Sequence, residues 1–121
     1  MSNNEFTMLP LILKISNQDI SNIMEKALNE GSCLHWCYNI ESIYGEMGSV
    51  SSIISNGGTL LFYGMEQVYQ LTKSKLMLGI QQALPYLTQF IKGDTLELSS
   101  IDPDDADFII QMALWNEVLF D

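Results

Sequence analysis

The chain has 121 residues, 47% of them hydrophobic, and its fifteen carboxylates outnumber five lysines to give a net charge of −10, with no arginine. This length and apolar content predict a single domain over residues 1–121 and exclude a disordered chain. The negative charge and the missing guanidinium groups argue against direct contact with nucleic acid or anionic membranes, and they favour a basic protein as the partner. Acidity also serves solubility alone, so the charge by itself identifies no partner.

The same composition bears on location. The longest apolar run, 8–13, is interrupted by Pro10 and is far shorter than the roughly 20 residues of a membrane-spanning helix. The first residues, MSNNEF, lack the basic start of a secretory signal, and two cysteines are too few for a disulfide framework. We therefore expect a cytoplasmic protein with reduced thiols and no cofactor.

The first elements predicted along the chain are a strand and a helix. Residues 9–16 are short, aliphatic and bounded by polar residues, which is typical of a strand. Residues 16–31 place apolar side chains at helical spacing, with Asp19 in the first turn and Gly31 at the end. This stretch predicts a well-formed amphipathic helix.

The middle of the chain predicts a small sheet. Within residues 33–48, Leu34, Trp36, Tyr38 and Ile40 alternate in a way that favours a strand or an extended segment, with these four residues on one face. A short helix or turn follows and ends at Asn56–Gly57, where a positive φ costs little. Residues 59–64 are apolar on both faces, as in a central strand, and 68–72 are the expected hairpin partner.

The last third predicts two more helices. Thr72 can cap the first, and Pro85 should kink it or end it early. Residues 94–100 are a possible edge strand, and the closing segment is the final helix. Strands and helices mix without regular alternation, which predicts the α+β class, with a small antiparallel or mixed sheet packed against about three helices.

The closing segment, IDPDDADFIIQMALWNEVLFD (101–121), holds six acidic residues. An EF-hand does not fit, because the positions that need glycine and glutamate hold aspartate and alanine. Helix capping fits well: Asp102 can accept backbone hydrogen bonds, and Pro103 suits the first helical position. Asp104 and Asp105 would then lie at the positive end of the helix dipole.

The rest of this helix is apolar on most sides, so either the core buries it or a partner covers it. In the second interpretation an aromatic anchor is surrounded by a charged rim, as in an interaction hot spot. The candidate partner-binding residues are Asp104, Asp105, Asp107, Trp115, Glu117 and Asp121.

Catalytic and metal chemistry have little support. Cys33, His35 and Cys37 would share one face of a strand, but the chain offers no other cysteine or histidine to complete a zinc site. A carboxylate could serve as a further ligand, and the alternative is a pair of buried thiols. With one histidine and no motif to orient it, we expect no enzyme and no metal.

Several short stretches carry a resemblance to a known group of proteins. They are Trp36–Cys37, 45–60, 69–80 and 101–120. In these stretches the chain resembles a family of small acidic uncharacterised proteins encoded by phages and mobile elements of gut Firmicutes and relatives. It departs from that pattern at Met47–Gly48, and at Trp115–Asn116, where a Phe–Gly pair is usual.

This resemblance implies a context rather than a set of catalytic residues. Small acidic proteins of mobile elements are often inhibitors of host defence, and some resemble nucleic-acid mimics that occupy the basic channel of a CRISPR effector or another nuclease. The expected function is therefore an anti-CRISPR-like or other anti-defence inhibitor that binds a basic host protein. The alternative is a housekeeping or antitoxin-like protein of the element that forms a homodimer through its last helix.

Overall fold

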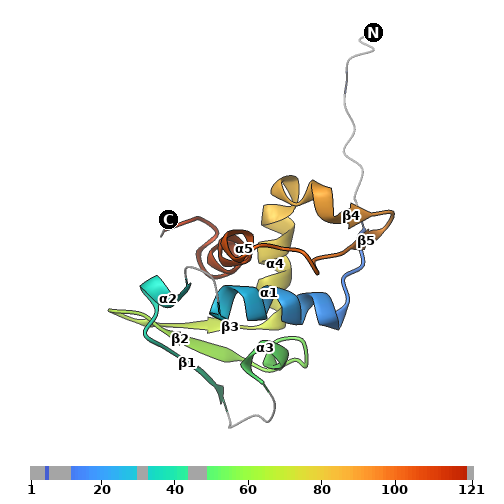
Figure 1. Cartoon of the computed structure of the whole chain (residues 1–121). Coiled ribbons are helices and arrows are strands. Elements are labelled where there is room, and N and C mark those ends of the chain that lie inside the picture. The colour runs from blue at the N-terminus through green and yellow to red at the C-terminus, as the bar shows by residue number, and fades with distance from the viewer. Residues whose placement is uncertain (1–4, 6–11, 30–32, 44–48, 120–121) are drawn as a thin grey trace.

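Helices and strands mix along residues 5, 12–29, 33–43 and 49–119, which this computed structural model describes, and the α+β prediction is confirmed. In chain order the elements are α1 (Asn17–Asn29), α2 (Cys33–Trp36), β1 (Asn39–Ser42), α3 (Val50–Ile53), β2 (Leu60–Tyr63), β3 (Val68–Leu71), α4 (Lys73–Ala83), η2 (Leu84–Tyr86), η3 (Thr88–Phe90), β4 (Ile91–Lys92), β5 (Thr95–Leu96) and α5 (Pro103–Trp115). Figure 1 shows the sheet of β1, β2 and β3 at one end of the molecule and the β4–β5 hairpin at the other, with the long helices between them.

Helix α1 confirms the predicted amphipathic helix, and its first turn is fixed by Ser16 and Asp19. The Ser16 hydroxyl accepts a hydrogen bond from the Asp19 backbone N–H (3.0 Å) and donates one to the Asp19 carboxylate (2.8 Å). The same carboxylate accepts from the backbone N–H of Leu98 (2.9 Å), far along the chain. A buried polar group that is fully bonded in this way costs little, and here it also ties α1 to the segment before α5.

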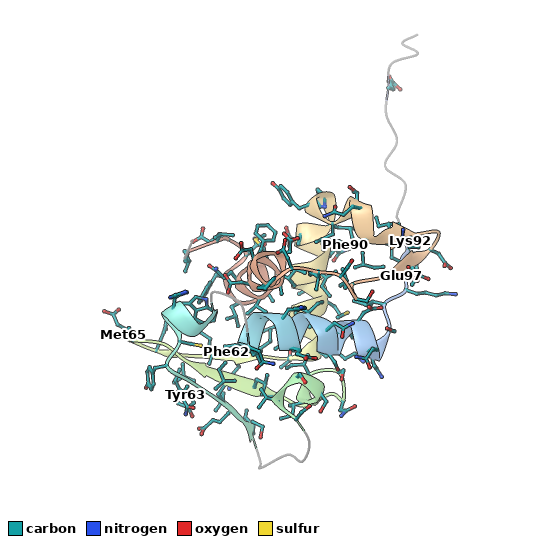
Figure 2. The ribbon with its side chains drawn as sticks, viewed as in Figure 1. Phe62, Tyr63, Met65, Phe90, Lys92 and Glu97 are labelled. Atoms are coloured by element: carbon teal, nitrogen blue, oxygen red, sulfur yellow. The ribbon has the colours of Figure 1, made fainter. Side chains whose placement is uncertain are left out.

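The three-stranded sheet confirms the predicted hairpin and its central strand. Strand β2 pairs antiparallel with both β1 and β3, with Phe62 opposite Ile40 and Tyr69. Successive side chains of a strand point to opposite faces, so Phe62 is fully buried in the core while its neighbour Tyr63 lies on the other face (Figure 2). One face of the sheet therefore covers the core, and the other is turned away from it.

Helix α4 also follows its sequence signals. The Thr72 side chain accepts a hydrogen bond from the Lys75 backbone N–H, which confirms the predicted cap. The α-helix ends at Ala83, and Pro85 lies in the 3₁₀ turn that follows, because proline lacks the backbone donor that an α-helix needs. Helix α4 packs closely against α5.

Two of the predicted strands are wrong. Residues 12–16 form only an isolated parallel bridge between Lys14 and Thr95, because the partner strand β5 is two residues long; residues 9–11 lie outside the described part. The stretch 33–40 is not one strand, since it begins as helix α2 and only its end enters β1. Trp36 is buried and Tyr38 is exposed, so the alternating residues do not share a face.

Candidate functional site

The start of α5 is an acidic corner. Asp102 caps the helix by accepting a hydrogen bond from the Asp105 backbone N–H (2.8 Å), as predicted, and Asp104 is exposed beside it. Partial burial raises the pKa of Asp105, and the neighbouring carboxylates of Asp102 and Asp104 raise it further. A raised carboxyl pKa at a helix N-terminus indicates that burial, together with repulsion from the two neighbouring carboxylates, outweighs the favourable helix dipole.

Asp107 does not belong to this acidic surface, and its assignment as a partner-binding residue is wrong. Its side chain is only 4% exposed. One carboxylate oxygen accepts from the indole N–H of Trp36 (3.2 Å), and the other accepts from the side-chain amide of Gln111 (2.7 Å). A carboxylate that is enclosed and bonded on both oxygens stabilises the interior and cannot form a charged rim.

Trp115 lies in an aromatic cluster rather than on an open surface. Its ring meets those of Trp36 and Tyr69 edge to face, with centroids 4.9 and 5.0 Å apart. Trp36 in turn stacks on the buried Phe62. These contacts support burial of the last helix over its use as an interface. Glu117 is exposed beyond the end of α5, and Asp121 lies outside the described residues.

The strand predicted to carry Cys33, His35 and Cys37 does not form, because Cys33 and His35 lie in helix α2 and Cys37 follows it. His35 is exposed, whereas Cys37 is buried. Burial raises the pKa of the Cys37 thiol to about 11, with a smaller contribution from the Asp107 carboxylate. Within the described ranges, no three histidine, cysteine or acidic side chains are grouped as metal ligands.

No protein family, curated protein or solved structure matches this chain. The resemblance noted from the short sequence stretches therefore stays a prediction. A second finding concerns membranes: no helix in the described part of the chain is both long enough and apolar enough to cross one.

The outer side of the three-stranded sheet is the surface that sequence reasoning missed. Cross-strand neighbours on this side form two rows, Asn39–Tyr63–Val68 and Glu41–Leu61–Gln70. Tyr38 and Met65 lie at the ends of the strands, and they are 73% and 92% exposed. We call this surface the open face, and it comprises Tyr38, Asn39, Glu41, Leu61, Tyr63, Met65, Val68 and Gln70.

The open face combines aromatic and acidic groups at short range. The rings of Tyr38 and Tyr63 lie 6.2 Å apart, and the Tyr63 hydroxyl donates a hydrogen bond to the Glu41 carboxylate. That hydrogen bond is the main reason why the pKa of Tyr63 is raised. The pair presents a π surface next to a carboxylate, an arrangement suited to a lysine or arginine side chain.

One sequence signal did point to the open face. Residues 59–64 are apolar at the positions that face either side of the sheet, which correctly indicates a central strand. Such a strand usually has both faces covered by other elements of the protein. Here Leu61 and Tyr63, on the outer side of β2, are only half-buried, so part of the apolar surface of this strand remains exposed.

Proposed function

We propose that this chain is a protein-interaction module that binds a basic partner through the open face. The exposed Tyr38 beside the Tyr63–Glu41 pair is the observation that carries this proposal. Tyrosine and methionine are enriched where proteins bind one another, because they bury a large area at a small entropic cost. Cation–π contact with the tyrosines and an ion pair with Glu41 would select a lysine or arginine of the partner.

The charge of the whole molecule supports the same kind of partner. Its net charge is −10, and the lysines with described contacts are engaged within the molecule. Lys14 pairs with Asp94 (3.4 Å), Lys73 donates to Asn17 (3.3 Å), and Lys75 donates to the carbonyl oxygen of Gln70 (2.9 Å). A field of this sign accelerates the approach of a basic protein, while the apolar contacts provide specificity.

The more specific form of the proposal is an anti-defence inhibitor. The resemblance to proteins of phages and mobile elements suggests a basic host nuclease or defence effector as the target. Carboxylates on a rigid surface can compete for lysine-lined and arginine-lined grooves that normally hold phosphates. The crowded aspartates at the start of α5 would add to this competition at longer range.

Affinity capture from a nuclease-treated bacterial lysate tests the proposal, with the immobilised chain compared at low and high salt. We expect the wild-type chain to retain a basic protein at low salt and to release it at high salt. Tyr38→Ala should lose this capture. Tyr86→Ala is the matched control, because Tyr86 is similarly exposed (68%) and also pairs with a neighbouring ring, that of Phe108.

Two results would contradict the proposal. One is equal capture by the two tyrosine variants, which would place the contact away from the open face. The other is tight binding of the purified chain to bare DNA or RNA at ordinary ionic strength, which its charge should prevent.

A further inference from the structure

Helix α4 has a second apolar side that faces a groove rather than α5. The groove has a volume of about 580 Å³. It is lined by Leu13, Ile15, Ser74, Met77, Leu78, Ile80, Gln81 and Leu84. Five of these residues, 74, 77, 78, 81 and 84, recur at helical spacing, so they form one stripe along α4 and into η2.

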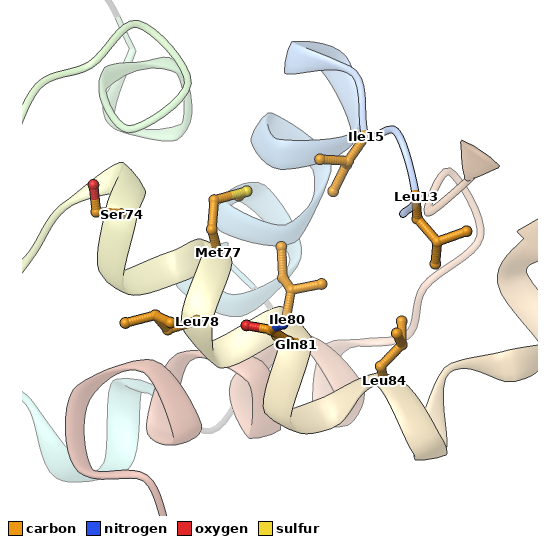
Figure 3. A pocket seen from close by; sticks show the side chains of 8 residues that line it. All are labelled: Leu13, Ile15, Ser74, Met77, Leu78, Ile80, Gln81 and Leu84. Carbon is orange, nitrogen blue, oxygen red and sulfur yellow. The ribbon is translucent and has the colours of Figure 1, made fainter. Parts of the chain in front are cut away.

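The groove lies between two apolar sides, and an exposed side chain projects at its rim. Figure 3 shows Leu13 and Ile15 on one side, with Met77, Ile80 and Leu84 of the helical side turned toward them. Leu78 points away from Leu13 and Ile15 at the outer rim, and its side chain is 60% exposed. The Leu78 side chain is therefore an exposed apolar knob directly beside an apolar groove on the same surface.

The described lining of the groove is also uncharged. The lining residues that the structure describes include no acidic residue and no lysine, although the chain has fifteen carboxylates. Helix α4 carries no acidic residue, and its two lysines lie in its first turn, bonded to Asn17, Ser55 and Gln70. A cationic partner gains nothing on such a surface. Two copies of a chain with a charge of −10 would repel each other least here.

We propose that the occupant of this groove is a second copy of the chain, in a two-fold dimer that pairs α4 with α4. A two-fold axis across the helices makes them antiparallel and brings the same surface patch of each copy into contact, so that a residue of one copy meets a complementary position of the other. Each Leu78 then packs into the partner's groove, and the lysine-bearing ends of the two helices point in opposite directions. The knob and the groove are self-complementary, which is what a two-fold contact requires.

This dimer differs from the one expected through the last helix, because α5 is covered by α1 and α4 within one chain. It is also independent of the open face, which leaves Tyr38 and Glu41 accessible in each copy.

Sedimentation equilibrium of the full chain across a concentration series tests the proposal. We expect the wild-type chain to follow a monomer–dimer equilibrium that tightens as salt is added, because salt screens the repulsion between the two acidic copies. Leu78→Lys should weaken the dimer by roughly tenfold or more, the effect of losing a central apolar anchor. Gln81→Lys, at an exposed polar position of the same rim, should weaken it as well.

Met65→Lys is the matched control, since it adds the same charge at an exposed apolar residue far along the sheet. Added positive charge alone reduces repulsion between copies, so this variant should dimerise at least as well as the wild type. A wild-type chain that stays monomeric at every concentration would overturn the proposal. Dimers that persist in Leu78→Lys and Gln81→Lys would overturn it too.

Binding of a basic partner through the open face and dimerisation through α4 can be contradicted independently of each other. Salt should weaken capture of a basic partner and strengthen the dimer. Leu78→Lys should still capture the partner, and Tyr38→Ala should still dimerise. Loss of both activities in either variant would show that one surface serves both, contrary to the placement argued above.

Discussion

Asp107 shows how one acidic residue can serve the interior of an acidic protein. Its carboxylate accepts from Trp36 on α2 and from Gln111 one turn further along α5. The Gln111 side-chain oxygen accepts in turn from the backbone N–H of Leu119 (2.9 Å). The network therefore links α2, α5 and the segment after α5 through a single buried charge.

Replacement of Asp107 by asparagine should destabilise the fold by about 1–3 kcal/mol. Asparagine keeps the volume but exchanges one acceptor oxygen for an NH₂ group. That group would face a second donor, either the Trp36 indole N–H or the Gln111 amide, and one of the two buried donors would lose its acceptor. Urea unfolding followed by tryptophan fluorescence measures the loss.

The control for this substitution is Asp104→Asn, at an exposed position three residues earlier on the same helix. We expect it to change the free energy of unfolding by no more than about 0.5 kcal/mol. Equal stability of Asp107→Asn and the wild type would show that the buried carboxylate does not hold the network together.

Cys37 predicts a specific loss of stability at alkaline pH. Its pKa is raised from 9.0 to about 11 in the folded chain, chiefly by burial. Between about pH 9 and about pH 11 the Cys37 thiol therefore stays protonated in the folded chain but loses its proton in the unfolded chain. The free energy of unfolding falls as the pH rises through this range. Tyr63, whose pKa is also raised, contributes a loss of the same sign.

Comparison with Cys37→Ala isolates the thiol. The variant is expected to be less stable near neutral pH, because it leaves a small gap in the core, but its stability should fall less steeply above pH 9. Urea unfolding at a series of alkaline pH values measures how the free energy of unfolding depends on pH in the wild type and in Cys37→Ala. Equal pH dependence in the two chains would show that the Cys37 thiol ionises equally easily in the folded and unfolded states.

At the scale of elements, the contact between α4 and α5 depends on Gly79. A methyl group at this position would lie 2.7 Å from the carbonyl oxygen of Ile109 and 2.7 Å from the backbone nitrogen of Ala113. Both are backbone atoms of α5, so the two helices would have to move apart. Alanine normally favours a helix over glycine by about 1 kcal/mol, but overpacking of this kind costs about 1–3 kcal/mol.

Gly79→Ala should therefore lower the free energy of unfolding, against the trend of helix propensity. Thermal unfolding by circular dichroism measures the change. Gln82→Ala, at an exposed position of the same helix, serves as the control and should be neutral or slightly stabilising. A more stable Gly79→Ala chain would mean that α4 and α5 do not approach so closely.

Long periodic segments with caps were predictable from sequence, and short segments were not. Thr72, Pro85 and Asp102 each act through their own backbone chemistry, and the helix ends that they predict are confirmed. The alternation over 33–40 does not identify a strand, because alternation over a few residues also fits one helical turn followed by a bend. The isolated bridge at Lys14 depends on pairing with Thr95, which local sequence does not contain.

The surfaces were less predictable than the elements for the same reason. Asp107 and Trp115 stand among acidic residues in the sequence, and only the packing of α5 against Trp36 and Tyr69 buries Asp107 and half-buries Trp115. Conversely, Tyr38 looks like a core residue by its alternation with Trp36, yet it ends up exposed. Which apolar residues stay outside is decided by tertiary contacts.

For the molecule as a whole, the two proposed contact surfaces differ in electrostatic character. The open face carries Glu41 among aromatic groups, whereas the described residues that line the groove beside α4 carry no charge. A basic partner and a second copy would thus be drawn to different places. The net charge of −10 sets the sign of the salt effect on each, and on folding as well.

Folding itself should be strengthened by salt. Repulsion among the carboxylates opposes the compact state, and screening relieves it, so the melting temperature should rise between low and moderate sodium chloride. A relief of about 1 kcal/mol would raise it by about 4 °C. The melting temperature should be measured in the Leu78→Lys variant, because a dimer that tightens with salt would also raise the melting temperature.

The matched control neutralises three exposed glutamates of this variant together, by Glu25→Gln, Glu66→Gln and Glu97→Gln. Leu78→Lys changes the net charge from −10 to −9, and the three glutamine substitutions change it further to −6. This control should start from a higher melting temperature and gain less from salt. A melting temperature that is flat or falls with salt in both chains would mean that local ion pairs, and not the overall charge, dominate the electrostatics of the fold.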